Sequence, residues 1–410
     1  MKRFAVIIAL FLLLSSCRKL EEAPPETTAP DQTSSEIVTT ELTETEFETE
    51  TEIETDSETE SPVNASNDGI VSIIMAGDVL LHDKVAASGK MNDGSYNYDH
   101  MFSNVKEDIE NADLAIINQE VILGGKDLGL SGYPNFNGAF EVGDSLVKSG
   151  FDVVLHATNH ALDKGKKGLL SCIDFWEENY PHIAYLGISD TKEKSENIYT
   201  TEIEGIKFAI LNYTYGTNGI PLPSDMPYCV NLLDKDRIMN DVSRAKEISD
   251  FVIVCPHWGT EYILTADNNQ KYWTNVFFEA GVDLVIGTHP HVVEPVELIE
   301  KNGHSMLVYY SIGNYINSTA QTGTGIANRM LGALADISVS KTENDVTITD
   351  YGIIPIVSHV KSGEGQCTVY KLDDYTEELA SQNEIIYSDS SFSLSYLQNL
   401  CESVFGDLYN

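Results

Sequence analysis

Acidic, amide and imidazole side chains follow five short apolar runs of the sequence, at the point where each run ends. They are Asp78 after the first run, Glu120 after the second, Asn159 and His160 after the third, His257 after the fourth, and His289 and His291 after the fifth. Carboxylate, imidazole and amide ligands together suit zinc, manganese or iron, and they need no thiolate. Two such ions about 3.5–4 Å apart can share a bridging carboxylate and activate water as a nucleophile. The residue types therefore predict a centre with two divalent metal ions; the alternative is a set of hydrogen-bonded polar residues at strand ends.

The five apolar runs have the length and composition of buried strands. They are Ile70–Ala76, Leu114–Asn118, Phe151–His156, Phe251–Pro256 and Asp283–Gly287. Amphipathic stretches typical of helices lie between them, at Gly165–Tyr180, Asp234–Asp250 and Asn269–Gly281. This alternation predicts an α/β domain with a mainly parallel core. Because the carboxyl ends of parallel strands open into one crevice, we expect the polar side chains to converge there.

Other segments indicate antiparallel pairing. Residues Ile198–Tyr215 and Pro295–Asn314 predict hairpins that turn at Glu-Gly and Asn-Gly, and Leu331–Ser358 continues as strand without a helix. The sheet is therefore expected to be mixed, and two sheets packed face to face fit the pattern. We predict a folded domain over residues 69–358 and a C-terminal extension over 359–410 with a terminal helix.

Four further polar or aromatic residues have two interpretations each. Glu261 suits an acid–base group, or a hydrogen bond that holds its loop. Trp258 and Tyr262 suit a substrate pocket, or aromatic packing under the sheet. Asn314 suits contact with a substrate carboxylate, or a tight glycine turn that closes the sheet.

Six motifs occur in a fixed order between about Ile70 and Tyr315. They are GDVLLHD, NQE, ATNHALDKG, HWGTEY, GTHPHVVEPVE and YYSIGNYI. In this order they resemble the CapA family of poly-γ-glutamate capsule-synthesis proteins, which is similar to the calcineurin-like metallophosphoesterases. The resemblance implies a metallophosphoesterase-like mixed-sheet α/β sandwich with a metal site.

The resemblance also implies roles for the first acidic residues. Asp78 matches the first metal-binding aspartate of the phosphoesterases. Those enzymes place a histidine two residues later, whereas His82 stands four residues later in this chain. Glu120 falls where the phosphoesterases have a bridging aspartate, so the resemblance implies a bridging glutamate with a longer arm.

The Asn-His pair and the later histidines follow the same resemblance. It implies Asn159 as a metal ligand and His160 as a proton donor or transition-state contact. An acidic residue follows this pair directly in the phosphoesterases; here Asp163 is the nearest carboxylate to orient the imidazole. The remaining implied ligands are His257, His289 and His291.

The N-terminal segment predicts that the protein is exported from the cytoplasm. Two basic residues precede the apolar run Phe4–Leu14, which is too short to span a bilayer and is typical of a signal peptide. The sequence Leu-Ser-Ser-Cys then resembles a lipobox, with Cys17 as the lipid-modified residue; the alternative is an ordinary cleaved signal. Residues 18–68 are rich in Thr and Glu and predict a disordered tether. We expect a lipid-anchored protein on the extracellular face of the cell membrane.

Composition limits the partners. The formal net charge is −39, and a nucleic-acid partner is not expected because phosphate binding needs clustered Lys and Arg. Family resemblance implies work on poly-γ-glutamate, an anionic polymer, or with its synthesis or export machinery. Three hypotheses stay open: a metal-dependent hydrolase or transferase in capsule synthesis, a phosphoesterase unrelated to capsule, and a non-catalytic scaffold that handles polymer.

Overall fold

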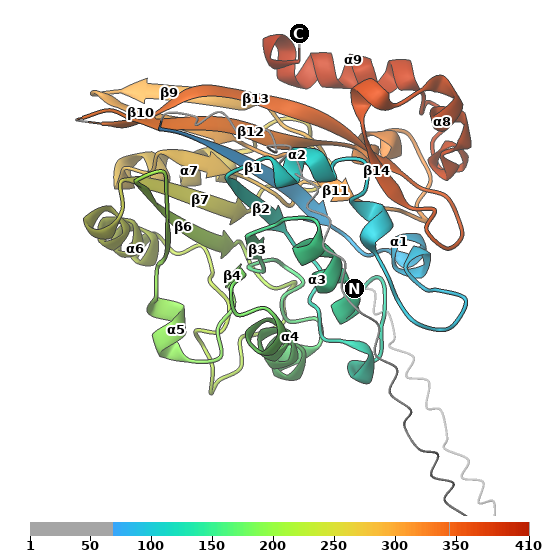
Figure 1. Cartoon of the computed structure of the whole chain (residues 1–410), viewed down its shortest axis with the longest axis horizontal. Helices are drawn as coiled ribbons and strands as arrows, with labels where there is room; N and C mark the ends of the chain where they lie inside the picture. Colours follow the sequence, from blue (N-terminus) through green and yellow to red (C-terminus); the bar gives the residue numbers. More distant parts are fainter. Residues whose placement is uncertain (1–68, 344, 410) are drawn as a thin grey trace, which may run out of the picture. The chain divides into compact units, whose positions relative to one another are not determined.

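Two β-sheets pack face to face in the computed structural model, with helices on the outer faces (Figure 1). The structure describes residues 69–343 and 345–409. The predicted signal peptide, Cys17 and the Thr/Glu-rich tether lie outside the described residues. Within residues 69–343 and 345–409, no helix is both long and apolar enough to cross a membrane.

The first sheet has eight strands in the order β14-β13-β12-β1-β2-β3-β4, and β11 also pairs with β1. Their bounds are β1 (Ile70–Val79), β2 (Leu114–Asn118), β3 (Val153–Leu155), β4 (Ala184–Leu186), β11 (Asn314–Ile316), β12 (Leu331–Lys341), β13 (Val346–His359) and β14 (Thr368–Lys371). Strands β1 to β4 and β11 run parallel, whereas β12, β13 and β14 are antiparallel additions.

The second sheet has six strands in the order β5-β6-β7-β8-β10-β9. Their bounds are β5 (Tyr199–Ile203), β6 (Ile206–Thr214), β7 (Phe251–His257), β8 (Leu284–Ile286), β9 (Val296–Lys301) and β10 (His304–Tyr309). Its four central strands are parallel, and β5 and β9 each close an antiparallel hairpin. The predicted mixed-sheet α/β sandwich is confirmed.

The described helices pack mainly on the outer faces of the two sheets. Their bounds are α1 (Asp83–Ser88), α2 (Lys106–Glu110), α3 (Phe140–Lys148), α4 (Gly165–Asn179), α5 (Lys192–Glu196), α6 (Lys235–Ile248), α7 (Asn268–Ala280), α8 (Glu377–Gln382) and α9 (Leu394–Phe405). Short 3-10 turns are η1 (Asp99–Met101), η2 (Lys126–Leu128), η3 (Ile326–Met330), η4 (Leu372–Asp374), η5 (Glu384–Tyr387) and η6 (Gly406–Leu408). Helices α6 and α7 pack on the second sheet, and α8 and α9 join the core outside the first. Helix α5 borders the gap between the edge strands β4 and β5. The division at residue 358 stays a prediction.

Side chains of a central strand alternate between two apolar cores, one between the sheets and one beneath the helices. In β1, Ile73 and Met75 point between the sheets, while Ile74 and Ala76 pack beneath the helices of the first sheet. In β7, Ile253 faces the same inter-sheet core. Successive side chains of a strand point to opposite faces, so strands covered on both sides become continuous apolar runs.

Both predicted hairpin turns are present. Glu204 and Gly205 have φ values of 49° and 74°, and Asn302 and Gly303 have values of 57° and 79°. Two consecutive positive φ angles match the twist of the flanking strands, which is the reason that two-residue hairpins favour glycine here.

Candidate metal centre

The carboxyl ends of β1, β2, β7 and β8 bring the predicted ligands into one cluster. Three groups have ligand atoms that all lie within 4.8 Å of one another: Glu120 with His257 and His289; Asp78 with Glu120 and His291; and Glu261 with His289 and His291. Glu120, His289 and His291 each belong to two of the three groups, and of these Glu120 is the carboxylate, the type of ligand that can bridge two ions.

The Glu120 carboxylate is fully buried, and neither of its oxygens accepts a hydrogen bond within the described residues. Its Oε1 lies 3.6 Å from His291 Nε2 and 3.8 Å from His257 Nε2. Burial raises the pKa of Glu120 well above its usual value, and the nearby Asp78 charge adds to the effect, whereas His291 opposes it. A buried carboxylate without hydrogen bonds is costly unless a cation compensates it. This environment fits a metal ion.

His291 is held between the two carboxylates. Its Nδ1 lies 3.2 Å from Asp78 Oδ2 and 3.1 Å from Asn314 Oδ1, which leaves Nε2 directed at Glu120. Burial alone would lower the pKa of His291, but Glu120 and the hydrogen bond to Asp78 together raise it to about 9. A divalent cation can replace the proton that these acidic neighbours otherwise hold on the imidazole.

His257 has the opposite electrostatic environment. Burial lowers its pKa well below the usual value, and the neighbouring histidines, His289 first, lower it further. Its Nε2 lies 2.9 Å from Asn159 Oδ1 and its Nδ1 lies 3.0 Å from the Thr288 hydroxyl. The imidazole is therefore neutral and its tautomer is set by side-chain partners, and the neutral ring is the form that binds metals.

The loop after β8 holds two histidines in an unfavourable backbone conformation. His289 has a φ of 101° and His291 a φ of 58°. The His289 backbone amide donates to Asp78 Oδ2 at 3.2 Å, and His289 Nδ1 has no partner within the described residues. Positive φ angles in non-glycine residues persist where surrounding structure enforces them, most often at functional sites.

His160 and Asp163 form a pair next to this cluster. His160 Nδ1 lies 2.7 Å from Asp163 Oδ2, and the same oxygen accepts the Phe136 backbone amide at 2.7 Å. The Phe136 ring packs edge-on at 4.7 Å from the imidazole. His160 Nε2 is thereby directed towards Glu120 Oε1, 3.8 Å away.

The remaining predicted residues lie around the cluster in different settings. His82 packs against the Phe136 ring at 5.1 Å and belongs to none of the three ligand groups, and burial lowers its pKa to about 4. Trp258 is fully buried on the far side of the sheet, where its indole donates to Tyr310 O, which favours the packing interpretation. Tyr262 is exposed at the rim, 6.0 Å from the His291 ring.

Asn314 is buried, and its side-chain amide forms hydrogen bonds within the protein. Its Nδ2 donates to the backbone carbonyls of His291 and Arg329, both at 3.0 Å, while Oδ1 faces His291 Nδ1. This arrangement favours a role in orienting His291 over contact with a substrate carboxylate.

Several neighbours of the cluster were not predicted from the sequence. Asn118 donates to Asp78 Oδ1 at 2.7 Å, and Asn218 lies 3.4 Å from His160 Nδ1. The exposed Tyr215 ring lies 4.6 Å from His289. Asn118 stands directly before the Gln-Glu pair, so its place at a strand end was a usable signal. Tyr215 directly follows β6 at the end of the predicted hairpin, and Asn218 lies in the loop beyond it, which carries no pattern.

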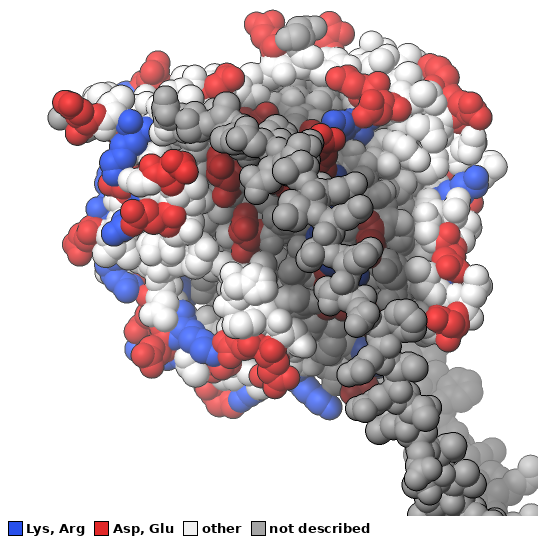
Figure 2. All heavy atoms as spheres, in the orientation of Figure 1, with Lys and Arg blue, Asp and Glu red and all other residues white. Residues whose placement is uncertain are grey.

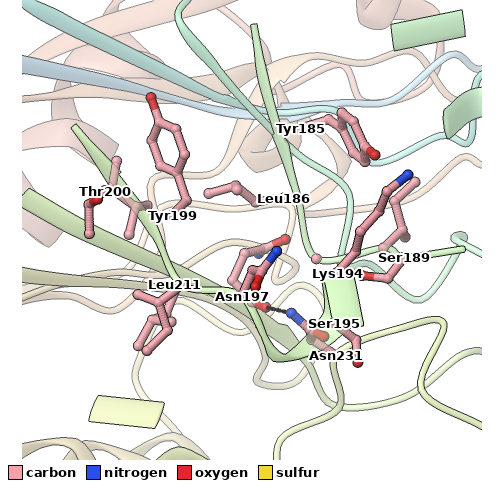
Figure 3. A pocket seen from close by; sticks show the side chains of 15 residues that line it. Tyr185, Leu186, Ser189, Lys194, Ser195, Asn197, Tyr199, Thr200, Leu211 and Asn231 are labelled. Atoms are coloured by element: carbon pink, nitrogen blue, oxygen red, sulfur yellow. Dashed lines mark hydrogen bonds between the residues drawn. The ribbon is translucent and has the colours of Figure 1, made fainter. Parts of the chain in front are cut away.

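A separate cavity of about 450 Å³ opens between the edge strands β4 and β5. Polar side chains such as Lys194, Asn197 and Asn231 line it (Figure 3). None of the predicted site residues is among its lining residues.

These features define an α/β sandwich protein with a histidine–carboxylate cluster at the carboxyl ends of its strands. Residues 72–319 match the family model described as "Bacterial capsule synthesis protein PGA_cap", and the chain belongs to this family. The predicted family resemblance is therefore confirmed.

Two curated relatives carry related names. The chain is 25% identical over 273 residues to "Capsule biosynthesis protein CapA" of Bacillus anthracis, covering 64% of each chain. It is 31% identical over 177 residues to "PGA biosynthesis protein CapA" of Bacillus subtilis (strain 168), covering 42% of this chain and 44% of the relative. The chain thus spans less than two thirds of the length of either relative.

Solved structures with a similar arrangement include the Haemophilus influenzae NAD nucleotidase NadN, at 14% identity and a TM-score of 0.43, with 82% of this chain and 67% of that chain covered. The calcineurin-like phosphoesterase YfkN from Bacillus subtilis matches at 12% identity and a TM-score of 0.41, with 80% and 99% covered.

Proposed function

We propose that this protein is a cell-surface lipoprotein of the CapA type that acts in poly-γ-glutamate capsule synthesis, export or anchoring through a site for two divalent metal ions. The observation that carries the proposal is the buried Glu120 carboxylate, which has no hydrogen bond and faces imidazole nitrogens of His257 and His291. Family membership and the names of the two CapA relatives support the link to capsule.

The first ion is proposed to be held by Glu120, His257, His289 and Asn159, and the second by Asp78, Glu120 and His291. Divalent ions at such a centre supply the Lewis acidity that makes water nucleophilic near neutral pH. Zinc, manganese and iron all suit these ligands, because the set contains imidazole, carboxylate and amide oxygen but no thiolate.

The chain's own groups suit hydrolysis or group transfer. Asp163 fixes the His160 ring through Nδ1 at 2.7 Å, so a protonated His160 can donate from Nε2 to a leaving group on the cluster side. Asp78 and Asn314 orient His291, and Asn118 orients Asp78. We propose His160 as the general acid, Asp163 as its positioning residue, and Glu261, at the exposed rim, as a further acid–base or ligand group.

Elemental analysis of the purified protein tests the metal site. The wild-type protein is expected to hold about two metal ions per chain, and the Asp78→Ala/His289→Ala double variant is expected to lose them. The control Asp236→Ala/His182→Ala changes two exposed residues of the same types and should keep the metal. Full metal content in the first variant would show that these ligands are wrongly assigned.

Turnover assays on the metal-loaded protein separate the three hypotheses. Shortening or transfer of poly-γ-glutamate, lost in His160→Ala, supports the capsule enzyme. Turnover of phosphate esters alone supports an unrelated phosphoesterase. Metal-dependent binding of polymer without any turnover supports the non-catalytic scaffold.

A further inference from the structure

Arg329 is a buried cation beside the candidate metal centre. Its side chain lies in the short turn η3, and the residue is only 7% exposed. The guanidinium carbon lies 3.6 Å from the centroid of the Tyr262 ring, so the ring supports one face of the guanidinium. Within the described residues, its Nε has no hydrogen-bond partner and no carboxylate forms an ion pair with it.

The other two arginines of the described residues are paired. Arg237 and Arg244 both contact Asp241, at 3.2 Å and 3.7 Å respectively. The formal net charge is −39, so the chain has many carboxylates that could have paired with a third arginine. Burial lowers the pKa of Arg329, and the nearby Tyr262 and Glu261 oppose this effect.

The backbone ties Arg329 to the candidate ligand His291. The Asn314 amide donates to the carbonyl oxygens of both residues at 3.0 Å, so the two peptide groups share one anchor. Tyr262 contacts both neighbours, since its ring centroid lies 3.6 Å from the Arg329 guanidinium carbon and 6.0 Å from the centroid of the His291 ring.

A buried guanidinium without an anion loses hydration and gains little in return. Its planar fork of N–H donors matches a carboxylate or a phosphate, and an aromatic ring behind it restricts the guanidinium to one orientation. We infer that Arg329, held against Tyr262, binds a free carboxylate of the substrate while the neighbouring reacting bond lies at the metal centre. This inference rests on the proposed function, which supplies the carboxylate-bearing polymer.

Isothermal titration of the full-length, manganese-loaded protein with a γ-linked glutamate oligomer tests the inference. The variant Arg329→Gln is expected to bind the oligomer at least about tenfold more weakly, because a charged hydrogen-bond pair is lost. Arg329→Lys keeps the charge but not the planar set of N–H donors, so its affinity for the oligomer should lie between those of the wild type and Arg329→Gln. This variant also provides the test if Arg329→Gln does not fold. Metal content should be unchanged in both variants.

Two controls define the outcome. Arg244→Gln should bind the oligomer as the wild type does, and an oligomer with amidated carboxyl groups should bind wild type and Arg329→Gln equally weakly. Equal oligomer affinity in wild type and Arg329→Gln would overturn the inference. So would a dependence on Arg329 that is seen only with phenyl phosphate, since the anion would then be a phosphoryl group.

Measuring turnover by the wild type distinguishes failure of the Arg329 assignment from failure of the proposed function. If the wild type turns over the polymer and Arg329→Gln binds it unchanged, only the carboxylate assignment fails. If no turnover occurs but oligomer binding depends on Arg329, the assignment stands and the catalytic proposal fails.

Discussion

At the scale of single residues, Glu120 decides the character of the site. A carboxylate that accepts no hydrogen bond and lies among imidazoles is unfavourable in the metal-free protein and favourable beside a cation. If a cation binds here as proposed, its binding is coupled to folding through this one side chain, since a cation that binds only the folded state stabilises that state.

The variant Glu120→Gln separates these two effects. Added manganese or zinc should raise the melting temperature of the wild type, by the equivalent of about 2.7 kcal/mol at one hundred times the dissociation constant. Glu120→Gln should lose this increase, because a neutral amide does not replace a carboxylate between two cations, while its melting temperature in EDTA should change much less. Differential scanning calorimetry with and without metal measures both. A full metal-dependent increase in the variant would contradict a bridging role.

Glu294 offers a second test, outside the ligand groups. Its carboxylate is fully buried, it accepts one hydrogen bond from Gln270, and its Oε1 has no partner within the described residues. Burial raises the pKa of Glu294 to about 8, with Asp267 adding to the effect while the hydrogen bond from Gln270 opposes it. The folded state thus holds a proton that the unfolded state releases near pH 4.5.

Stability linked to Glu294 is present below about pH 4.5 and is lost as the pH rises through about 8. Glu294→Gln removes this dependence, so its free energy of unfolding relative to wild type should rise between pH 5 and pH 8, by on the order of 3 kcal/mol. Urea denaturation in EDTA at the two pH values measures the difference. An unchanged difference would mean that Glu294 titrates normally in the folded protein.

At the scale of elements, the strands that place the ligands were predictable, and many contacts among their ends were not. Apolar runs at β1, β2, β7 and β8 carry strong local patterns, because strands buried on both faces need apolar residues throughout. The strand β4 was missed although β3 and β8 are equally short, because its three residues are only half-buried and do not form a run rich in Val and Ile.

In the candidate site, too, some residues could be predicted from the sequence and others could not. Ligand-type residues at strand ends were visible in the sequence because the topology of parallel strands brings such ends together. The partners that orient them, such as Thr288 for His257 or Asn314 for His291, depend on side-chain directions across segments far apart in the chain. The pairing of Arg329 with Tyr262 is likewise a tertiary contact, 67 positions apart by residue number.

Close packing at Gly77 holds Asp78 in place. A Cβ at Gly77 would lie 2.0 Å from Gly313 O, and that oxygen also accepts the Asp78 amide. Gly77→Ala should therefore separate β1 from the residue before β11, destabilise the fold by about 2 kcal/mol or more, and lower metal content. The matched control is Gly352→Ala in β13, where a Cβ would meet nothing within 4 Å.

Urea denaturation and elemental analysis on the same samples measure both effects. Normal metal content in a destabilised Gly77→Ala variant would show that Asp78 does not depend on this contact. A loss of stability in Gly352→Ala as large as that in Gly77→Ala would show that any added methyl group on this sheet is harmful.

At the scale of the whole molecule, the net charge of the protein has to be compatible with binding an anionic polymer. Figure 2 shows Asp and Glu side chains spread over one face, with Lys and Arg scattered among them. A net charge of −39 repels a polyanion at long range, so binding must come from local cations. The metal centre and Arg329 are the proposed local cations, and we expect oligomer binding to need both.

Anchoring is the remaining whole-molecule proposal, and it depends on Cys17, which lies outside the described residues. If Cys17 carries the lipid, Cys17→Ser should move the protein from the membrane fraction to the soluble or secreted fraction, because acyl chains supply the membrane affinity. The control Cys401→Ser changes a buried cysteine of α9 and should leave the protein in the membrane fraction. Detergent phase partitioning and labelling with a fatty-acid analogue measure the outcome. Retention of Cys17→Ser in the membrane would instead indicate that another segment or a partner holds this protein at the cell surface.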